Sequence, residues 1–326
     1  MLFGSLAGSA VAAASAMGGS IAPIQKEEKY DMAFATAVNI ASAPTGLLIP
    51  PTSAFIVYST VVGGVSISAL FMAGYIPGIL MGLGVMVVAY LYARSHKYPT
   101  TGVVSAKVAL KVTLDALPSF LLIVIVIGGI VSGVFTATEG AGVCVVYCLF
   151  LSVLYRSITY KSFMKILVDS ACVSGIILFL ISASSAMSWV MAFSGIPTAI
   201  AEGLTAISDN KYVLFFLINI ILLIIGMFMD ITPAILIFTP IFLPICTSLG
   251  MDPVHFGVML IFNMCIGSMT PPVGSVLFVG CGITKMSIER VSAKLVPYFL
   301  VLIAILMLIT YVPAISLAIP QALGLM

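Results

Sequence analysis

Long runs of apolar residues, separated by short charged or turn-forming stretches, fill almost the whole chain. Most runs are long enough for a helix that crosses a lipid bilayer, which takes about 20 apolar residues. The pattern predicts a small-residue stretch and then a series of apolar segments, with the boundaries 3–24, 33–64, 69–93, 118–137, 140–155, 166–193, 212–229, 231–248, 254–282 and 295–316. Residues 105–117 mix charged and apolar positions and predict an amphipathic helix lying in the membrane interface.

Two of the apolar segments, 33–64 and 254–282, contain residues that interrupt helices. Proline removes a backbone donor and glycine tolerates unusual backbone angles, so we expect both segments to be broken helices. The interrupting residues are Pro44, Gly46, Pro50 and Pro51 in the first segment and Gly267, Pro271 and Pro272 in the second.

The stretches 212–229 and 231–248 are separated only by Asp230. This gap leaves no room for a polar loop between two helices. The pair is therefore either one long span or a hairpin that enters and leaves the membrane on the same side.

An internal repeat appears when the chain is aligned with itself at an offset of 221 residues. Several of the identities are proline and glycine, which specify backbone geometry, so chance similarity between two apolar stretches explains them poorly. The identical pairs are Pro23 with Pro244, Asp31 with Asp252, Gly46 with Gly267, Pro50-Pro51 with Pro271-Pro272, and Ser66-Ile67 with Ser287-Ile288.

The distribution of basic residues favours the hairpin and makes the repeats inverted. If 212–248 is a hairpin, an odd number of predicted crossings separates the repeats. Twelve of the 13 basic residues then lie on one side, expected to be cytoplasmic, and Lys211 lies on the other. The twelve are Lys26, Lys29, Arg94, Lys97, Lys107, Lys111, Arg156, Lys161, Lys165, Lys285, Arg290 and Lys294. A single crossing at 212–248 would reduce this bias to nine against four, and the hairpin places the C-terminus outside.

Composition agrees with an integral membrane protein and excludes other classes. The chain is 62% hydrophobic and 7% charged, with a mean hydropathy of +1.27. A net charge of +2 without a basic stripe argues against nucleic-acid binding. The six cysteines form no C-x-x-C pair and the two histidines are distant in sequence, so we expect no transition-metal site.

Inverted repeats with broken helices are the arrangement in which secondary transporters bind solutes and ions near the membrane midplane. Hydroxyl, amide and backbone carbonyl oxygens near the breaks suit a weakly bound Na⁺ ion. Asp230 is an acid inside an apolar run, where ionisable residues are functional by default. It could instead cap the helix that begins at Ile231, and the sequence leaves both roles open.

Five short segments resemble the large permease subunit of the tripartite ATP-independent periplasmic (TRAP) transporters. They are residues 4–11 (GSLAGSAV), 49–52 (IPPT), 136–141 (TATEGA), 230–233 (DITP) and 269–274 (MTPPVG). The resemblance runs along the whole chain. It implies an elevator-type, sodium-driven transporter of the bacterial inner membrane with organic-acid substrates such as dicarboxylates or sialic acids. It also implies a periplasmic solute-binding protein and a small four-helix membrane subunit as partners.

The repeat and the resemblance together predict two Na⁺ sites and a substrate site, with no other cofactor and no enzymatic activity. The first Na⁺ site would comprise Ser5, Ser9, Ser42, Thr45 and Gly46, and the second Asp230, Thr232, Asn263, Gly267 and Thr270. The substrate would contact Ser9, Pro51, Thr52 and Pro272.

The expected fold is an all-α polytopic bundle with inverted repeats, re-entrant hairpins and broken helices. Residues 1–64 would form the first hairpin arm and broken helix, 65–165 scaffold helices, 166–282 the second hairpin and broken helix, and 283–326 a C-terminal scaffold helix. Family members carry further spans before the motif at 4–11, so we expect the first repeat to be incomplete.

Two other functions remain open from the residues alone. A membrane-embedded enzyme could use Asp230 as an acid or base, but it would need a histidine or a second acid at helical spacing. A channel or structural subunit would not need inverted hairpins.

Overall fold

The computed structural model describes residues 4, 8–96, 105–208 and 210–326, and this described part contains helices and no strands. Six of its helices are long and apolar enough to cross a membrane, which confirms the all-α polytopic class. The chain divides into two compact units, Met1–Tyr98 with Ser184–Met326 and Pro99–Ala183. Compactness does not reveal which parts move, so the division into transport and scaffold ranges stays a prediction.

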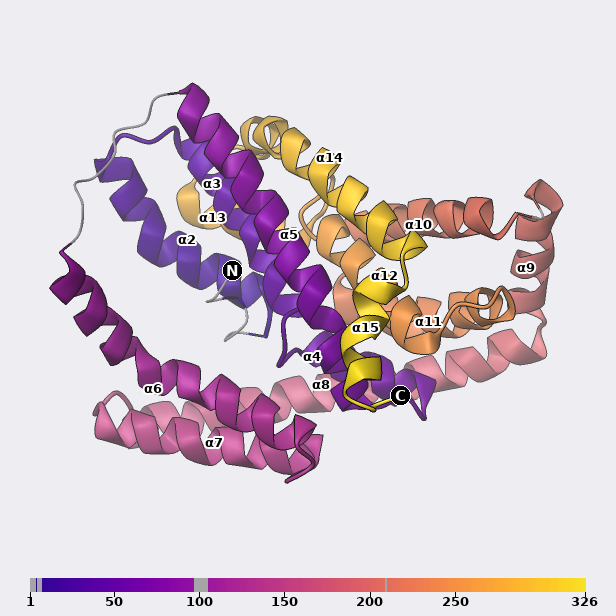
Figure 1. The fold of residues 1–326 in the computed structure, drawn as a ribbon, viewed down its shortest axis with the longest axis horizontal. Coiled ribbons are helices and arrows are strands. Elements are labelled where there is room, and N and C mark those ends of the chain that lie inside the picture. The colour runs from indigo at the N-terminus through magenta and orange to yellow at the C-terminus, as the bar shows by residue number, and fades with distance from the viewer. Residues whose placement is uncertain (1–3, 5–7, 97–104, 209) are drawn as a thin grey trace. The chain divides into compact units, whose positions relative to one another are not determined.

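The first unit holds most of the helices (Figure 1). Its helices are α2 (Ala10–Glu27), α3 (Met32–Ser42), the short 3-10 helix η1 (Ala43–Leu47), α4 (Ser53–Val62), α5 (Ile67–Ser95), α9 (Ile196–Ile207), α10 (Lys211–Phe228), α11 (Ile231–Ser248), α12 (Pro253–Gly267), α13 (Ser275–Thr284), α14 (Ile288–Tyr311) and α15 (Ala314–Ala322). The short helices α9 and α15 were not expected from the hydropathy pattern.

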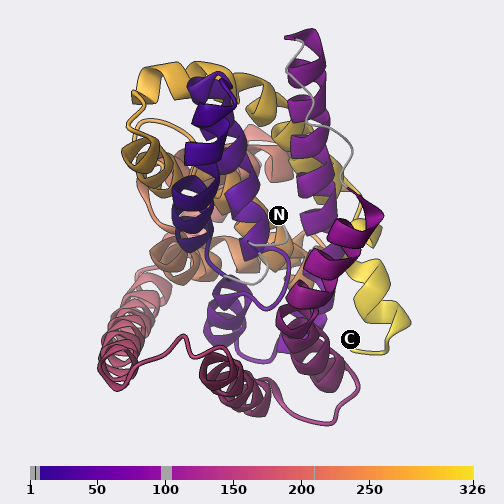
Figure 2. The ribbon, with the colours of Figure 1, turned by 90° about the vertical axis from the view of Figure 1, so that its left-hand side faces the viewer.

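The second unit contains α6 (Ala106–Val131) and α7 (Ala137–Leu154), which lie side by side (Figure 2), and most of α8 (Tyr160–Phe193). One prediction is wrong here, because residues 105–117 are not a separate interfacial helix. Helix α6 continues through Pro118 into the apolar segment. Proline removes one backbone donor but does not force a helix to end where apolar helix-forming residues continue on both sides.

The repeat seen in the sequence is also a structural repeat. Helices α2 and α11 begin and end at positions 221 residues apart, and so do their N-caps, Ser9 and Asp230. The caps of α3 and α12, Asp31 and Asp252, obey the same offset. In both repeats a broken helix follows: residues 43–52 form the first break and residues 268–274 the second break. The Pro-Pro bond in each break is cis.

Helices α5 and α14, which are equivalent in the two repeats, run in opposite directions. Lys294, near the start of α14, contacts Tyr92 near the end of α5. Gly84, earlier in α5, faces Val301 and Ile305, later in α14. The repeats are therefore inverted, as the count of crossings predicted.

The first break contacts α12 just before the second break begins. The Cys265 thiol donates to the Pro44 carbonyl oxygen at 3.5 Å, and these two residues are 221 positions apart. Equivalent residues can touch only near the axis that relates the repeats. The pseudo-two-fold axis therefore passes beside this contact.

The stretch 212–248 is a hairpin. Helices α10 and α11 are joined by Met229 and Asp230 alone. Lys211 at the start of α10 and Leu249 just after α11 line one cavity, so the open ends of the two helices lie together. This geometry confirms the hairpin and excludes one continuous span.

Glycine allows each hairpin to pack directly against its break. A Cβ atom on Gly46 would clash with the backbone of Gly4, and one on Gly267 would lie 2.5 Å from the Cα atom of Gly226. Real Cβ atoms do not approach backbone this closely. A similar close contact with a glycine in both repeats explains why glycine occupies positions 46 and 267.

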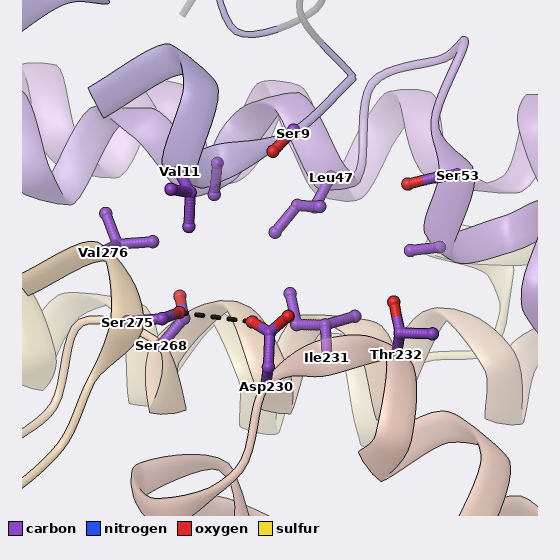
Figure 3. Close-up of a pocket in the computed structure, with 12 residues that line it drawn as sticks. Ser9, Val11, Leu47, Ser53, Asp230, Ile231, Thr232, Ser268, Ser275 and Val276 are labelled. Carbon is purple, nitrogen blue, oxygen red and sulfur yellow. Dashed lines mark hydrogen bonds between the residues drawn. The ribbon is translucent and has the colours of Figure 1, made fainter. Parts of the chain in front are cut away.

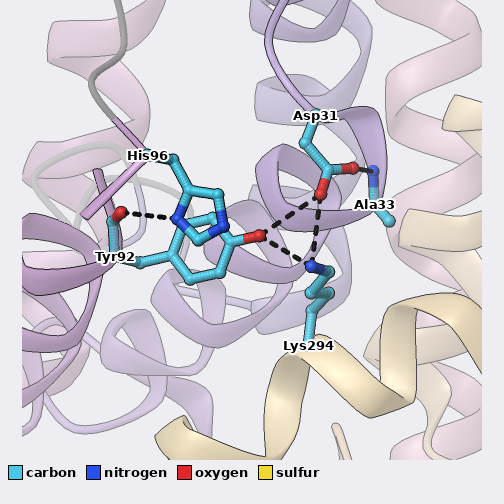
Figure 4. Close-up of polar contacts among 5 residues, drawn as sticks. All are labelled: Asp31, Ala33, Tyr92, His96 and Lys294. Carbon is cyan, nitrogen blue, oxygen red and sulfur yellow. Dashed lines mark hydrogen bonds and ion pairs between the residues drawn. The ribbon is translucent and has the colours of Figure 1, made fainter. Parts of the chain in front are cut away.

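A cluster of polar side chains joins the start of α3 to α5 and α14 by hydrogen bonds and an ion pair (Figure 4). The Lys294 ammonium lies 3.3 Å from Asp31 Oδ2 and donates to the Tyr92 hydroxyl at 2.6 Å. Asp31 Oδ1 also accepts from the backbone amide of Ala33 at 3.0 Å. Burial alone would raise the pKa of the Asp31 carboxyl, but the Ala33 amide and the Lys294 ammonium outweigh it and hold the pKa below its ordinary value.

Gly267→Ala should lower the free energy of unfolding by about 1–3 kcal/mol, because the new methyl group overlaps the backbone of Gly226. The control is Gly282→Ala, an exposed position in α13 with open space around it. This change should be neutral or stabilise by up to about 1 kcal/mol through helix propensity. Thermal unfolding of the purified protein in detergent measures both, and equal melting temperatures would contradict the close contact.

Asp31→Asn should lower the melting temperature at neutral pH, and the difference from the unchanged protein should shrink in acid. A carboxyl whose folded pKa is lowered stabilises above its unfolded pKa, about 3.9, and loses this contribution as pH falls through the folded value. Thermal melts between pH 7 and pH 3 test this. Glu28→Gln, which alters an exposed acid in the same turn, is the control. A difference that persists unchanged in acid would rule out the charge interaction.

Candidate functional site

A cavity of about 80 Å³ lies between the two repeats in the first unit (Figure 3). Its lining comes from both hairpin regions and both breaks. The lining residues are Ser9, Ala10, Val11, Leu47, Ser53, Ala54, Asp230, Ile231, Thr232, Ser268, Ser275 and Val276. Five pairs among them are related by the 221-residue offset, so the cavity lies on the pseudo-two-fold axis.

Four helices direct their N-terminal ends into this cavity. They are α2 and α11, which follow the hairpin tips, and α4 and α13, which follow the breaks. The first backbone N–H groups of a helix lack intrahelical partners, and the helix dipole places positive potential there. Convergence of four such ends favours a negatively charged group in the cavity.

Asp230 is an exposed carboxylate in the wall of the cavity. It occupies the N-cap position of α11, but its side chain makes no capping hydrogen bond. Oδ1 instead accepts from the Ser275 hydroxyl at 3.3 Å. Its repeat partner Ser9 does cap α2, accepting from the Ala12 amide at 3.4 Å. The carboxylate of Asp230 is therefore not engaged by the backbone and faces the cavity.

The two halves of the cavity differ in polarity. At equivalent positions the first repeat has Ser9, Val11, Leu47 and Ala54, where the second has Asp230, Thr232, Ser268 and Ser275. The backbone frame is thus symmetric while the chemistry is concentrated on the second repeat. A ligand with one charged or polar end would bind in a single orientation.

Of the described residues predicted for the first ion site, Ser42, Thr45 and Gly46 lie in or beside the first break, and Ser9 lines the cavity. Ser5 lies outside the described residues. The Thr45 hydroxyl donates to the Ser42 carbonyl at 2.7 Å, and Gly46 packs on Gly4. Ser42 donates to the Asn39 carbonyl at 3.1 Å.

The residues predicted for the second ion site are divided in the same way. Asp230 and Thr232 line the cavity, whereas Asn263, Gly267 and Thr270 do not. Asn263 and Gly267 are buried in the last turns of α12. The Thr270 hydroxyl donates to the Ile266 carbonyl at 2.6 Å. Assignment of both ion sites remains a prediction.

Of the residues predicted to contact substrate, Ser9 alone lines the cavity. The Pro51 carbonyl lies beside Gly8 near the first hairpin tip, and Pro272 is exposed in the second break. Thr52 is buried, donates to the Leu47 carbonyl at 3.0 Å and caps α4. Its hydroxyl is therefore engaged by the backbone.

Sequence reasoning missed Ser53 and Ser275, whose positions border the cavity. Both lie in the first turn of the short helix that follows a Pro-Pro break. The sequence did carry this signal, because a helix begins shortly after each of the two equivalent Pro-Pro pairs. A search for helix N-termini after each break would have found them.

Comparison with known proteins shows the family of the chain. The family described as tripartite ATP-independent periplasmic transporter, DctM component, matches residues 1–315. An uncharacterized protein of Salmonella typhimurium is 52% identical over 98% of this chain and 73% of its own length. The C4-dicarboxylate TRAP transporter large permease protein of Pseudomonas aeruginosa is 37% identical over 100% of this chain and 76% of its own. The sialic acid TRAP transporter large permease protein of Vibrio cholerae is 35% identical over 98% and 75%.

These matches extend over nearly the whole chain and include the hairpins, the breaks and the cavity between them. The chain therefore belongs to the DctM component family of the tripartite ATP-independent periplasmic transporters and is a membrane permease of that type.

Proposed function

We propose that this permease imports a small organic acid together with Na⁺. The observation that carries the proposal is the convergence of four helix N-termini on a cavity with one carboxylate in its wall. The relatives named for C4-dicarboxylates and sialic acid support the acid as substrate, since both compounds carry carboxylates.

Asp230 links the acid to a cation. A substrate carboxylate 5 Å from Asp230 would be repelled by about 3 kcal/mol at an effective dielectric constant of 20. A Na⁺ ion beside Asp230 removes this repulsion, so ion and acid bind best together. Mutual dependence of this kind is what a symporter requires.

The proposed ion ligands combine side-chain and backbone oxygens near both breaks. The first site uses Ser5, Ser9, Ser42, Thr45 and the carbonyl region of Gly46, and the second uses Asp230, Thr232, Asn263, Thr270 and the carbonyl region of Gly267. Backbone carbonyls and hydroxyls do not titrate near neutral pH, which supports Na⁺ over a proton.

The proposal includes the partners and location typical of a tripartite transporter. A periplasmic binding protein delivers the acid, and a small membrane subunit packs beside the permease in the bacterial inner membrane. Elevator-type movement gives alternating access to the cavity. The inverted repeat supports this mechanism, because exchange of conformation between two equivalent halves produces two equivalent openings.

An enzyme is a weaker proposal for this cavity. Among the described lining residues Asp230 alone has a titratable side chain, and Ser275 is its hydrogen-bond partner. An acid or base catalyst would need a second titratable group within reach.

Asp230→Asn should abolish sodium-driven uptake, because the amide retains the side-chain shape but cannot offset the charge of a cation. Uptake is measured with the partner subunits and binding protein in proteoliposomes under an imposed Na⁺ gradient. Asp115→Asn, which removes an exposed carboxylate from α6, is the control and should transport normally. If a pH gradient in sodium-free medium drives uptake by the unchanged protein as well as a Na⁺ gradient does, Na⁺ coupling is overturned.

The basic residues predict the orientation of the chain. A reporter fused after Met326 should be periplasmic, and one fused at Lys97 should be cytoplasmic. Alkaline phosphatase and fluorescent-protein fusions distinguish these locations. Finding both positions on one side would contradict the proposed topology.

A further inference from the structure

Three buried polar residues form a hydrogen-bonded chain beside the second break. They are Thr310 of α14, Asn219 of α10 and Asn263 of α12, and they are 2%, 0% and 0% exposed. Asn219 Nδ2 donates to Thr310 Oγ1 at 3.1 Å, and Asn263 Nδ2 donates to Asn219 Oδ1 at 2.7 Å. These hydrogen bonds therefore connect α10, the first arm of the second hairpin, to α12 and α14.

Backbone carbonyls determine the direction of every bond in this chain, because a carbonyl oxygen only accepts. The Thr310 hydroxyl donates to the Leu306 carbonyl at 2.8 Å, so its oxygen is left to accept from Asn219. Asn219 gives its second N–H to the Phe215 carbonyl at 2.9 Å. Its Oδ1 atom must therefore be the group that faces Asn263.

The same reasoning orients Asn263. One of its N–H groups meets Asn219 and the other donates to the Met259 carbonyl at 2.9 Å. Both donors of the Asn263 amide are then in use. A flipped amide would place oxygen against two oxygen acceptors, so the network holds the amide in one orientation.

The consequence is an amide oxygen with no partner. Asn263 Oδ1 is buried and makes no hydrogen bond to any described residue. An unmatched buried acceptor is costly, and native structures retain one where a ligand or water completes it. No N–H or O–H group of the network remains to donate to this oxygen, and an amide oxygen is a ligand that a hard cation takes.

Asn263 lies about one helical turn before the second break. Gly267 follows four residues later, on the same face of α12, and α12 ends there. Ser268, the next residue, lines the central cavity. Close packing of Gly226 on Gly267 holds α10 against this end of α12.

We infer that Asn219 and Thr310 are positioning residues that keep the Asn263 carbonyl oxygen directed toward the coupling cation. This inference rests on the Na⁺ coupling proposed above and extends it to two residues that do not belong to the ion site. Asn219 acts through Asn263, and Thr310 acts through Asn219. Occupancy of the ion site is thereby connected to packing of the hairpin arm against α12 and α14.

A merely structural network would predict a different result. If the three side chains only join α10, α12 and α14, their loss lowers thermal stability equally with and without sodium. If they orient an ion ligand, their loss raises the Na⁺ concentration needed for half of the sodium-induced stabilisation. The readout is therefore the half-saturating Na⁺ concentration and not the melting temperature itself.

The experiment uses the purified chain in detergent, with thermal melts across a NaCl series in which choline chloride keeps ionic strength constant. Asn219→Leu removes both functions of the amide at similar volume. Thr310→Val removes only the hydroxyl, and Thr310→Ser keeps it. Both Asn219→Leu and Thr310→Val should raise the half-saturating Na⁺ concentration about fivefold to tenfold, whereas Thr310→Ser should match the unchanged protein.

Thr284→Val is the matched control. The Thr284 hydroxyl lies in α13, outside the network, and donates to the Gly280 carbonyl four residues earlier at 2.9 Å, as the Thr310 hydroxyl donates to the Leu306 carbonyl. The change removes the same kind of hydrogen bond without altering Asn219 or Asn263, so its half-saturating Na⁺ concentration should not move. If Asn219→Leu does not fold, the comparison of Thr310→Val with Thr310→Ser decides the question.

The possible outcomes separate the two proposals. Sodium stabilisation of the unchanged protein, with the same half-saturating concentration in Asn219→Leu and Thr310→Val, would overturn the positioning role and leave sodium coupling intact. A protein whose melting temperature is the same in sodium and in choline would overturn sodium coupling, and the positioning role with it.

Discussion

The architecture depends on one constraint: where a helix is interrupted inside an apolar protein, the freed backbone groups still need hydrogen-bond partners. Peptide groups in a membrane must find partners within the protein, because lipid offers none. The breaks meet this requirement locally: Thr52 donates to the Leu47 carbonyl, and the Val276 amide donates to the Ser268 carbonyl. The second break also receives help from its hairpin, since the Gly274 amide donates to the Met227 carbonyl at 3.2 Å.

Packing of each hairpin against its own break follows from the same constraint. Backbone can approach backbone only where side chains are absent, which is why Gly46 faces Gly4 and Gly267 faces Gly226. These contacts bring the starts of four helices to one place. The positive ends of the helices then surround the cavity without any basic side chain among its described lining residues. The anion affinity that we propose for the cavity is therefore a property of backbone placement.

Symmetry of the backbone contrasts with asymmetry of the side chains. In the cavity, Asp230 replaces Ser9 and Ser268 replaces Leu47. At the hairpin bases, Asp31 pairs with Lys294, but the residue equivalent to Lys294 in the first repeat is Ala73, so Asp252 lacks the corresponding ion pair. The duplicated frame supplies two equivalent surfaces, and a few differences between the repeats place most of the polar side chains of the cavity on the second repeat.

The sequence by itself determined the membrane class, the broken helices and the inverted repeat. These features depend on local or periodic properties: apolar length, proline and glycine at fixed spacing, and the uneven distribution of basic residues. The same offset of 221 residues relates the bounds of α11 to those of α2 in the structure. Pattern alone failed at Pro118, because a proline marks a possible helix end without deciding whether the helix continues.

Only the tertiary structure decided which polar groups remain available for binding. Thr52 and Asp230 both precede helices, yet Thr52 is engaged by backbone and Asp230 faces the cavity. Asn219 attracted no attention in the sequence, because a single amide in an apolar helix has no recognisable motif. Its importance arises from Asn263 and Thr310, which lie 44 and 91 positions away along the chain. Hydrogen-bond partners so distant in sequence are set by packing of three helices, and no local pattern encodes that packing.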